Sequence, residues 1–341
     1  MSPSMRVLAV TNNPQGASFR QRVGVYVEIL RNLGITCEVA QLPRDIGARW
    51  QLFRRSSQYD GVFLHKKKLG AFDAMCLRRH ARRIIYNYDD AIMYNEKSPA
   101  KPGWLRSIAF TRTVKLADMV LVGSSYLADF ARPHNSNVQV LPIGLDTREY
   151  RPEESTNRDG KIRLVWIGSR STLKYLRQME GVLEEIGRRH KDVVLRIVCE
   201  EFLDLKNLVV EKRQWSVRTR AEDLATSDVG LAPLPDDPFT RGKCSFKVLE
   251  YSASRLPVVA SPIGTNAYYV REGLTGFLCR HPQQWVDRIN QLVLDPSLRT
   301  AMGRAGVDRA KEFDVQVIGH RLADLIRGCL EVRPASSGAQ E

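Results

Sequence analysis

The sequence predicts an α/β protein built from two doubly wound, Rossmann-like domains. Short apolar runs rich in β-branched residues alternate with helical stretches along most of the chain, which is the pattern of βα units and parallel sheets. A polar segment with a proline and a glycine, residues 147–160, divides this alternation into two series. The chain has 341 residues, which is enough for two separate hydrophobic cores.

The first series predicts strands joined by helices. The strands are expected at residues 6–11, 36–42, 61–65, 83–88, 119–123 and 138–142. The helices are expected at residues 18–33, 46–56, 70–81, 102–116 and 124–132. We expect this series to form a first domain that covers residues 1–150.

The second series repeats the arrangement after the polar segment. Its strands are expected at residues 164–167, 193–198, 207–211, 228–232, 257–261 and 276–279. Its helices are expected at residues 172–189, 219–225, 244–254, 283–294, 297–312 and 315–330. We expect a second domain over residues 151–331 and a frayed tail over residues 332–341.

Composition is that of an ordinary soluble globular protein, with 43% hydrophobic and 26% charged residues. No apolar run approaches the roughly 20 residues that cross a bilayer, and the N-terminus enters a strand without a signal-peptide core. The 6 cysteines are scattered without CxxC spacing. We therefore expect a cytoplasmic protein with free thiols, and neither zinc nor disulfides.

The net charge of +14 is concentrated in the first half of the chain. Residues 1–150 hold 22 basic and 12 acidic residues, and residues 44–117 alone hold 16 and 6. This excess is either a solvated surface or a site that attracts an anionic membrane or an anionic acceptor. The candidate membrane-facing residues are Lys66, Lys67, Lys68, Arg78, Arg79, Arg82 and Arg83, with Trp50, Phe53, Trp104 and Phe110. We find no nucleic-acid-binding motif and expect no nucleic acid.

Residues 241–276 carry the most informative motif. Lys243, Lys247 and Glu250 follow one another at spacings of four and three, which places them on one face of a helix. A β-branched run at residues 257–261 suits a buried parallel strand and ends in a turn signal. A cationic helix start beside the carboxyl end of a parallel strand is where open α/β sheets bind phosphorylated ligands.

This motif and several others resemble the retaining nucleotide-sugar glycosyltransferases of the GT-B fold, glycosyltransferase family 4. The likeness covers roughly residues 5–315 and is carried by residues 117–125, 141–146, 163–169, 228–234 and 273–278 in addition to the motif. It implies two Rossmann-like domains that face each other across a cleft. It also implies that the first binds the acceptor, the second binds the nucleotide sugar, and the last helix crosses back to the first domain.

The resemblance implies that basic side chains and a helix N-terminus hold the donor diphosphate without a metal. The basic candidates are Arg170, Lys174, Lys243 and Lys247, and the neighbouring donor-binding candidates are Gly168, Ser169, Ser245 and Phe246. A serine inserted after Gly168 shifts Arg170 and Lys174 from the family spacing. The alternative is that Ser169, Ser171 and Thr172 cap the following helix and bind phosphate through backbone N–H groups.

Glu250 matches the second glutamate of the family's E-x7-E motif, which resembles a clamp on the nucleotide ribose hydroxyls. A carboxylate accepts two such hydrogen bonds, so the assignment is chemically sensible. The first glutamate of that motif would fall at position 242, where this chain has Gly242. The identity of the donor sugar therefore does not carry over.

Candidates in the first domain follow its strands. Gly16 permits close approach of a donor ligand. Arg20 and Arg22 lie in the first turns of a helix, where cations oppose the dipole, so either an anion or a carboxylate compensates them or they face outward. Asp89 takes the position of a family histidine near the transferred sugar, with Asp90 beside it. Asp89 binds a hydroxyl, orients the acceptor or removes its proton, unless it only caps a strand end.

The resemblance therefore implies a retaining, metal-independent glycosyltransferase of the bacterial cell-envelope or polysaccharide type. Such an enzyme is expected to move a sugar from a UDP- or GDP-sugar to a hydroxyl of a glycan or lipid-linked acceptor. Asp89, Arg170, Lys243 and Lys247 are the expected catalytic residues, and no cofactor is expected. The protein is expected in the cytoplasm, and its basic first domain leaves open a peripheral position at the cytoplasmic membrane face. The alternatives are a nucleotide-sugar epimerase and a non-catalytic nucleotide-sugar-binding protein on the same fold.

Overall fold

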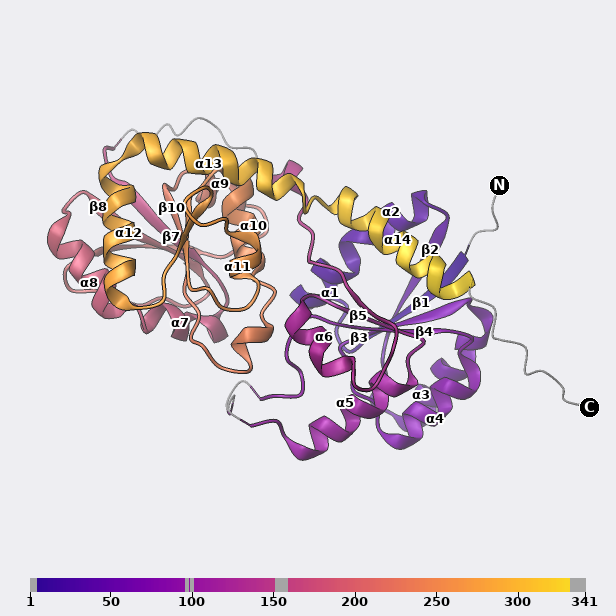
Figure 1. Ribbon diagram of the computed structural model, residues 1–341. Coiled ribbons are helices and arrows are strands. Elements are labelled where there is room, and N and C mark those ends of the chain that lie inside the picture. The colour runs from indigo at the N-terminus through magenta and orange to yellow at the C-terminus, as the bar shows by residue number, and fades with distance from the viewer. Residues whose placement is uncertain (1–4, 96–97, 99–100, 151–158, 332–341) are drawn as a thin grey trace, which may run out of the picture. The chain divides into compact units, whose positions relative to one another are not determined.

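The computed structural model describes residues 5–95, 98, 101–150 and 159–331 (Figure 1). The chain forms two compact units, one of Met1–Gly144 with Val315–Glu341 and one of Leu145–Asp314. The passage into the second unit thus comes shortly before the expected boundary at residue 150. Most of the expected linker and all of the expected tail lie outside the described residues.

The first unit contains a parallel six-stranded sheet in the order β2-β1-β3-β4-β5-β6. Its strands are β1 (Met5–Thr11), β2 (Ile35–Gln41), β3 (Gly61–His65), β4 (Ile84–Tyr88), β5 (Met119–Val122) and β6 (Val138–Val140). Its helices are α1 (Ala17–Arg22), α2 (Val27–Asn32), α3 (Ile46–Arg55), α4 (Ala71–His80), α5 (Trp104–Leu116), α6 (Ser125–Ala131) and α14 (Val315–Glu331). The order reverses between β1 and β3, which makes the carboxyl ends of these strands the place where doubly wound sheets bind ligands.

The single helix expected at residues 18–33 is divided. Val23 has φ −135°, outside helical geometry, so α1 ends there and a short 3-10 turn, Gly24–Tyr26, precedes α2. The last helix, α14, packs against α2 within the first unit. Gly319 allows this close approach, because a Cβ at that position would lie 2.8 Å from Ile29 Cγ2.

The second unit has a parallel six-stranded sheet in the order β12-β11-β10-β7-β8-β9. Its strands are β7 (Ile162–Ile167), β8 (Val193–Cys199), β9 (Val209–Gln214), β10 (Val229–Ala232), β11 (Val258–Ala260) and β12 (Gly276–Leu278). Its helices are α7 (Leu173–Arg177), α8 (Glu180–Arg189), α9 (Arg220–Ala225), α10 (Phe246–Ala253), α11 (Asn266–Tyr269), α12 (Pro282–Leu294) and α13 (Pro296–Lys311). This is the strand order of the Rossmann fold, with its reversal between β7 and β10.

The predicted fold class, two Rossmann-like α/β units, is confirmed by these two sheets. The inner strands of both sheets are buried on both faces, as continuous apolar strands require, whereas the edge strands β2 and β9 are partly exposed. In the first unit, β3 and β4 are buried along their whole length, and in the second unit so is β8. Sequence patterning missed short elements, such as α11 and the 3-10 turns, and the single helix expected at residues 172–189 is divided into α7 and α8.

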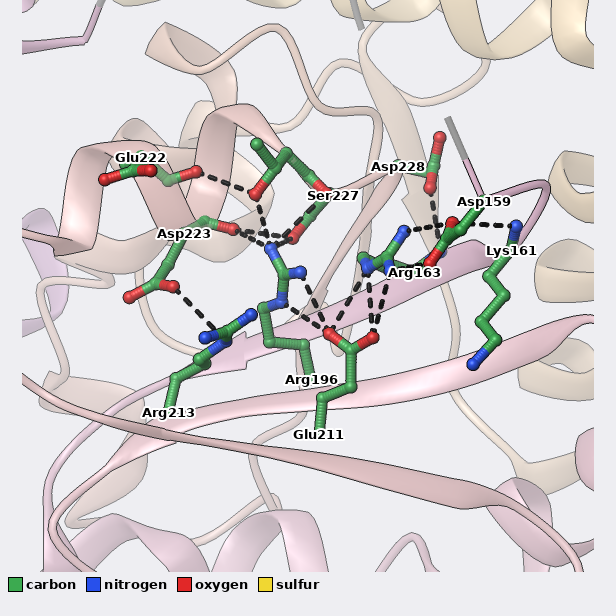
Figure 2. A network of polar contacts seen from close by, with 11 residues as sticks. Asp159, Lys161, Arg163, Arg196, Glu211, Arg213, Glu222, Asp223, Ser227 and Asp228 are labelled. Carbon is green, nitrogen blue, oxygen red and sulfur yellow. Dashed lines mark hydrogen bonds and ion pairs between the residues drawn. The ribbon is translucent and has the colours of Figure 1, made fainter. Parts of the chain in front are cut away.

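A network of ion pairs joins the neighbouring strands β7, β8 and β9 of the second sheet (Figure 2). Arg196 of β8 is 3% exposed, and all three of its guanidinium nitrogens have partners. Its Nε and Nη2 contact Glu211 of β9 at 3.0 and 2.9 Å, and its Nη1 donates to the Asp223 carbonyl at 2.7 Å. Arg163 of β7 reaches the same glutamate at 3.1 Å. Because the guanidinium groups of both Arg163 and Arg196 are paired with carboxylates, we assign the network a structural role.

Candidate functional site

The strands β7 and β10 separate at their carboxyl ends, and Tyr251 of α10 fills the gap. Their pairing stops at Gly230 opposite Val165. Beyond it, the Tyr251 hydroxyl accepts a hydrogen bond from Ile167 N–H at 3.0 Å and donates one to the Leu231 carbonyl at 3.1 Å. Gly230 makes room for the ring, since a Cβ there would lie 2.5 Å from it. The helix that carries the motif is thereby anchored at the switch point of the sheet.

Gly168 and Trp166 shape the loop that follows β7. A Cβ at Gly168 would lie 2.5 Å from Trp166 Cη2 and 2.9 Å from Thr172 Oγ1, so only glycine fits. Trp166 is fully buried, and Lys247 Nζ lies 4.3 Å from the centroid of its ring. A cation this close to an indole face is attracted by the ring quadrupole. The ammonium expected to bind diphosphate is therefore held at the end of β7.

Lys247 is poised between its charged and neutral forms. Burial lowers the pKa of its ammonium to about 7, and the Glu250 carboxylate only partly opposes that shift. An anion placed against this group would stabilise the charged form and raise the pKa again. The environment thus favours an anionic ligand over water at this position.

The N-terminus of α10 offers backbone donors beside Lys247. Ser245 precedes the helix in the left-handed conformation, with φ 48°, which is strained for a residue with a Cβ. Its buried Oγ has no hydrogen-bond partner among the described residues, and no side chain there caps the helix. Gly264, at φ 61°, brings the loop after β11 against the Lys243 carbonyl. The uncapped N–H groups suit a phosphate.

Glu250 is buried and tied to two residues that the sequence had not indicated. The Tyr150 hydroxyl donates to Glu250 Oε1 at 2.8 Å, and Arg220 Nε donates to the same hydroxyl at 3.0 Å. Arg220 Nε also lies 3.7 Å from Glu250 Oε1 and its Nη2 contacts Glu149. Burial raises the pKa of the Glu250 carboxyl, and Tyr150 and Arg220 oppose that rise. These neighbours orient the carboxylate that is expected to bind ribose.

The contacts described for Arg170 and Lys174 are with residues other than Lys247. Arg170 is exposed and its Nε lies 2.5 Å from Glu201 Oε1. Lys174 of α7 lies 5.1 Å from the centroid of the Tyr175 ring. Ser169 and Thr172 form a capping box at the start of this helical segment. Lys243, in turn, lies 4.5 Å from the Phe239 ring, and Phe246 is half-buried at the first position of α10.

In the first unit, Asp89 and Asp90 lie directly after β4 and share one cation. Lys66 Nζ lies 2.9 Å from Asp89 Oδ1 and 2.5 Å from Asp90 Oδ2. Ser18 does not cap α1, because Gly16 holds that position; its hydroxyl contacts Asp89 instead. Arg20 is exposed, whereas Arg22 is buried. The two arginines therefore do not form the outward-facing pair that was one of the alternatives.

Sequence reasoning did not single out Tyr150, Arg220, Tyr251 or His65. Each gains its role from a partner far away along the chain, as with Tyr150 and Glu250. In the part of the chain that the structure describes, no three His, Cys, Asp or Glu side chains gather as metal ligands would. Within that part, helices long and apolar enough to cross a bilayer are also absent.

Comparison with known proteins places this geometry in a family. Residues 154–295, which hold the switch point, Lys247 and Glu250, match the family described as glycosyl transferases group 1. The matched residues lie within the second unit. This matches the resemblance that the sequence motifs indicated.

The curated relatives that this chain resembles are named as glycosyltransferases. A D-inositol 3-phosphate glycosyltransferase of Corynebacterium aurimucosum is 33% identical over 260 residues, which are 67% of this chain and 61% of that protein. One of Pseudarthrobacter chlorophenolicus is 29% identical over 234 residues, 61% of this chain and 52% of that protein. The chain thus spans about half to three fifths of the length of the curated relatives it matches.

Similar solved structures show the GT-B fold for this chain. Sucrose-phosphate synthase from Thermosynechococcus elongatus superposes with a TM-score of 0.72 at 14% identity, over 95% of this chain and 98% of that one. HepE from Anabaena, solved with UDP and glucose, gives 0.70 at 17% identity, over 95% and 100%. WaaG, from lipopolysaccharide biosynthesis, gives 0.65 at 16% identity, over 94% and 100%.

Proposed function

We propose that this protein is a retaining glycosyltransferase that uses a UDP- or GDP-sugar and needs no metal. One observation carries the proposal: Lys247 lies beside an uncapped helix start at the switch point of the second sheet. A phosphate there meets both a cation and free N–H groups, and each charge-assisted contact contributes about 1.5–3 kcal/mol. Such fixed positive groups stabilise a departing diphosphate.

The acceptor is a hydroxyl of a glycan or a lipid-linked sugar in envelope or polysaccharide synthesis. The curated relatives are named for an inositol phosphate acceptor, and WaaG belongs to lipopolysaccharide biosynthesis. We expect a front-face path, in which the acceptor attacks from the side that the diphosphate leaves. The leaving phosphate accepts the proton of the acceptor hydroxyl, while Lys243 and Lys247 stabilise the negative charge of the phosphate. Arg170 contributes only after leaving its exposed pair with Glu201.

Transfer from UDP- and GDP-sugars in the presence of EDTA tests this function. The acceptor panel includes inositol phosphate, simple glycosides and lipid-linked glycans. We expect a product that keeps the anomeric configuration of the donor. A new nucleotide sugar formed without acceptor would instead show an epimerase. Tight nucleotide binding without turnover on any acceptor would show a non-catalytic binder, and activity restored to an EDTA-treated enzyme only by manganese would contradict metal independence.

We also propose that the first unit binds anionic membranes through α3, α4 and α5, and this location differs in part from the expected patch. Phe53 and Phe110 are 1% and 4% exposed, so they cannot anchor the protein. Arg78 pairs with Asp118 at 2.8 Å, and Lys66 pairs with Asp89 and Asp90. Because Arg78 and Lys66 form ion pairs within the fold, they contribute little positive charge for binding lipid headgroups.

A different set of side chains suits a bilayer. Helix α4 packs against both α3 and α5, and Figure 1 shows the three together. Their exposed large apolar residues, the α3–α5 apolar face, are Ile46, Trp50, Phe72, Met75, Trp104, Leu105 and Ile108. Exposed basic residues on or beside these helices include Arg44, Arg54, Arg79, Lys101 and Arg106. Trp104 is 75% exposed, which calls for a partner, and basic neighbours select an anionic one.

Co-sedimentation with vesicles tests the membrane proposal. We expect binding to phosphatidylglycerol vesicles that weakens as salt rises, and little binding to phosphatidylcholine vesicles. Replacing Trp104 and Leu105 by serine should release the protein. The matched control is Leu294→Ser, which changes a 66% exposed leucine of α12 in the second unit. Equal binding of both variants would contradict the assigned face.

A further inference from the structure

A buried polar cluster in the first unit lies where β1, β3 and β4 end. His65 is the last residue of β3, and Asp89 follows β4. The Ser18 hydroxyl lies 2.9 and 2.8 Å from the two Asp89 carboxylate oxygens and 3.1 Å from His65 Nε2. His65 and Asp89 are 3% and 6% exposed. The cluster occupies the switch point of the first sheet, where a ligand is expected.

Hydrogen bonds around Asn87 fix the tautomer of His65. Asn87 Nδ2 donates to the Leu121 carbonyl at 3.0 Å, so Asn87 Oδ1 faces His65 Nδ1 at 2.9 Å. An amide oxygen only accepts, and therefore His65 Nδ1 carries the hydrogen. Burial lowers the pKa of His65 to about 4, so the ring is neutral near pH 7. Its Nε2 consequently presents a lone pair.

The lone pair of His65 Nε2 and the Asp89 carboxylate compete for the one hydroxyl hydrogen of Ser18. Among the described residues, the hydrogen-bond partner of His65 Nε2 is Ser18 Oγ. The Ser18 hydroxyl has one hydrogen, and both Asp89 oxygens are closer to it. A bond to a carboxylate is the stronger of the two, so Ser18 donates to Asp89. His65 Nε2 is left as a buried acceptor without a donor, which destabilises the ligand-free state.

Arg22 provides unused donors in the same region. It is 4% exposed, and its Nη1 donates to the Leu141 carbonyl at 2.8 Å. Its Nε and Nη2 have no partner among the described residues. The charge of Arg22 acts on both Asp89 and His65, lowering the pKa of each. The buried Arg196, by contrast, has all three nitrogens bonded, so incomplete pairing is not the rule for buried arginines here.

Charge within the cluster is already balanced. Although burial opposes ionisation, Lys66 and Arg22 hold the pKa of Asp89 well below its usual value. Two carboxylates, Asp89 and Asp90, therefore face two cations, Lys66 and Arg22. Lys66 reaches the carboxylates from a left-handed backbone conformation, φ 56°, a strain that suggests a functional placement. A phosphate would disturb this balance, whereas an uncharged hydroxyl would not.

We propose that Ser18 and His65 are positioning residues of a subsite for an uncharged sugar or polyol hydroxyl. The substrate hydroxyl donates its hydrogen to Asp89 and accepts one from Arg22. Ser18 then turns its hydrogen to His65 Nε2, and the unsatisfied acceptor gains its donor. This exchange rearranges hydrogen bonds only: no proton is transferred and no group changes its charge. The inference rests on the proposed glycosyl transfer, in which this hydroxyl belongs to the acceptor or to the transferred sugar.

Nuclear magnetic resonance of the histidine side-chain nitrogens tests the subsite without catalysis. The His65→Gln variant identifies the signals of His65. In the free protein we expect the Nδ1–H tautomer, with no titration between about pH 5 and 8. Methyl glucoside or inositol should shift the Nε2 signal as a hydrogen bond forms, and inorganic phosphate should not. In Ser18→Ala the shift should vanish.

Three results would overturn the proposal. They are an Nε2–H tautomer, a polyol response that survives in Ser18→Ala, and no response to polyols up to their solubility limit. A kinetic arm adds a second readout: Ser18→Ala should raise about tenfold the KM of the one substrate that carries this hydroxyl, acceptor or donor, and leave the other KM unchanged. Ser18→Thr should restore the raised KM, and the exposed Ser57→Ala is the matched control. Absence of transfer by the wild type would refute the proposed function, yet the nitrogen signals would still decide this inference.

Discussion

The phenol of Tyr150 donates a 2.8 Å hydrogen bond to the carboxylate of Glu250, a residue 100 positions further along the chain. Tyr150 lies within the segment expected as a linker, residues 147–160, and it is 3% exposed. The bond orients a buried carboxylate whose pKa is raised by burial. Both carboxylate oxygens accept from ribose hydroxyls only when the group is ionised, because protonation turns one oxygen into a donor, so Tyr150 keeps Glu250 in its useful form.

Replacing Tyr150 by phenylalanine should raise the pKa of Glu250 further, because the hydrogen bond to the ionised form is lost. We expect UDP affinity to decline as pH falls through the Glu250 pKa, and to do so at higher pH in Tyr150→Phe than in the wild type. Calorimetric titrations across a pH series measure this. The control is Tyr268→Phe, which changes a 54% exposed tyrosine of the same unit. Superimposable pH curves for the wild type and Tyr150→Phe would rule out this role.

Glu250→Gln should remove the preference for ribose. A glutamine retains the shape but offers one acceptor oxygen, so the wild type should bind UDP more tightly than 2′-deoxy-UDP by about tenfold, and the variant should bind them equally. Competition binding measures the ratio. If the wild type does not distinguish the two nucleotides, Glu250 does not contact the ribose.

Binding of UDP should take up a proton at Lys247. The ammonium has a pKa of about 7 in the free protein, below its usual 10.5, so it is mostly neutral at about pH 8. The diphosphate restores the charge, and affinity should therefore fall as pH rises above 7. Calorimetry in buffers of different ionisation enthalpy at about pH 8 measures the uptake, which Lys247→Met should lack. Equal proton uptake by both proteins would contradict the assignment.

Tyr251→Phe should destabilise the second unit. The variant keeps the ring against Gly230 but leaves Ile167 N–H and the Leu231 carbonyl without their partner. Unsatisfied buried groups cost about 1–3 kcal/mol, so the free energy of unfolding in urea should fall by this amount. Tyr268→Phe should change it little. An unaltered urea midpoint would show that the hydroxyl does not hold the strands.

Gly168→Ala should lower both stability and nucleotide affinity. The new methyl would lie 2.5 Å from Trp166, and overpacking of this kind costs about 1–3 kcal/mol. The matched control is Gly181→Ala in α8, where a Cβ meets nothing within 4 Å. That change should stabilise the protein by roughly 0.5–1 kcal/mol, because alanine favours helix. Thermal melts with and without UDP measure both effects.

The strands were predictable because each is a short apolar run bounded by turn residues. The runs at Val62 and Ile197, for example, are buried on both faces. The helix break at Val23 was not predictable, since it depends on how Arg22 turns into the core. Likewise Phe53 and Phe110 look like surface anchors in a basic region, but helix faces decide that they are buried.

The site was predictable where a local spacing carries it. Lys247 and Glu250 share a helix, so their i,i+3 relation was visible in the sequence. The partners that tune them were not, because Trp166 and Tyr150 approach from elsewhere in the fold. Arg170 shows the opposite case: its motif indicated a phosphate contact, and the structure gives it an exposed pair with Glu201. The proposed role of His65 depends on its contact with Ser18, which lies 47 residues earlier, so the local sequence does not indicate it.

The most direct test of the central claim is calorimetric titration of UDP and uridine into the wild type and Lys247→Met, with EDTA present. We predict that the wild type binds UDP without metal and that Lys247→Met loses about 10- to 100-fold in UDP affinity while uridine binding is unchanged. The control variant is Lys311→Met on α13, whose lysine pairs with Asp308. Unchanged UDP affinity in Lys247→Met, or binding that EDTA abolishes, would contradict the account.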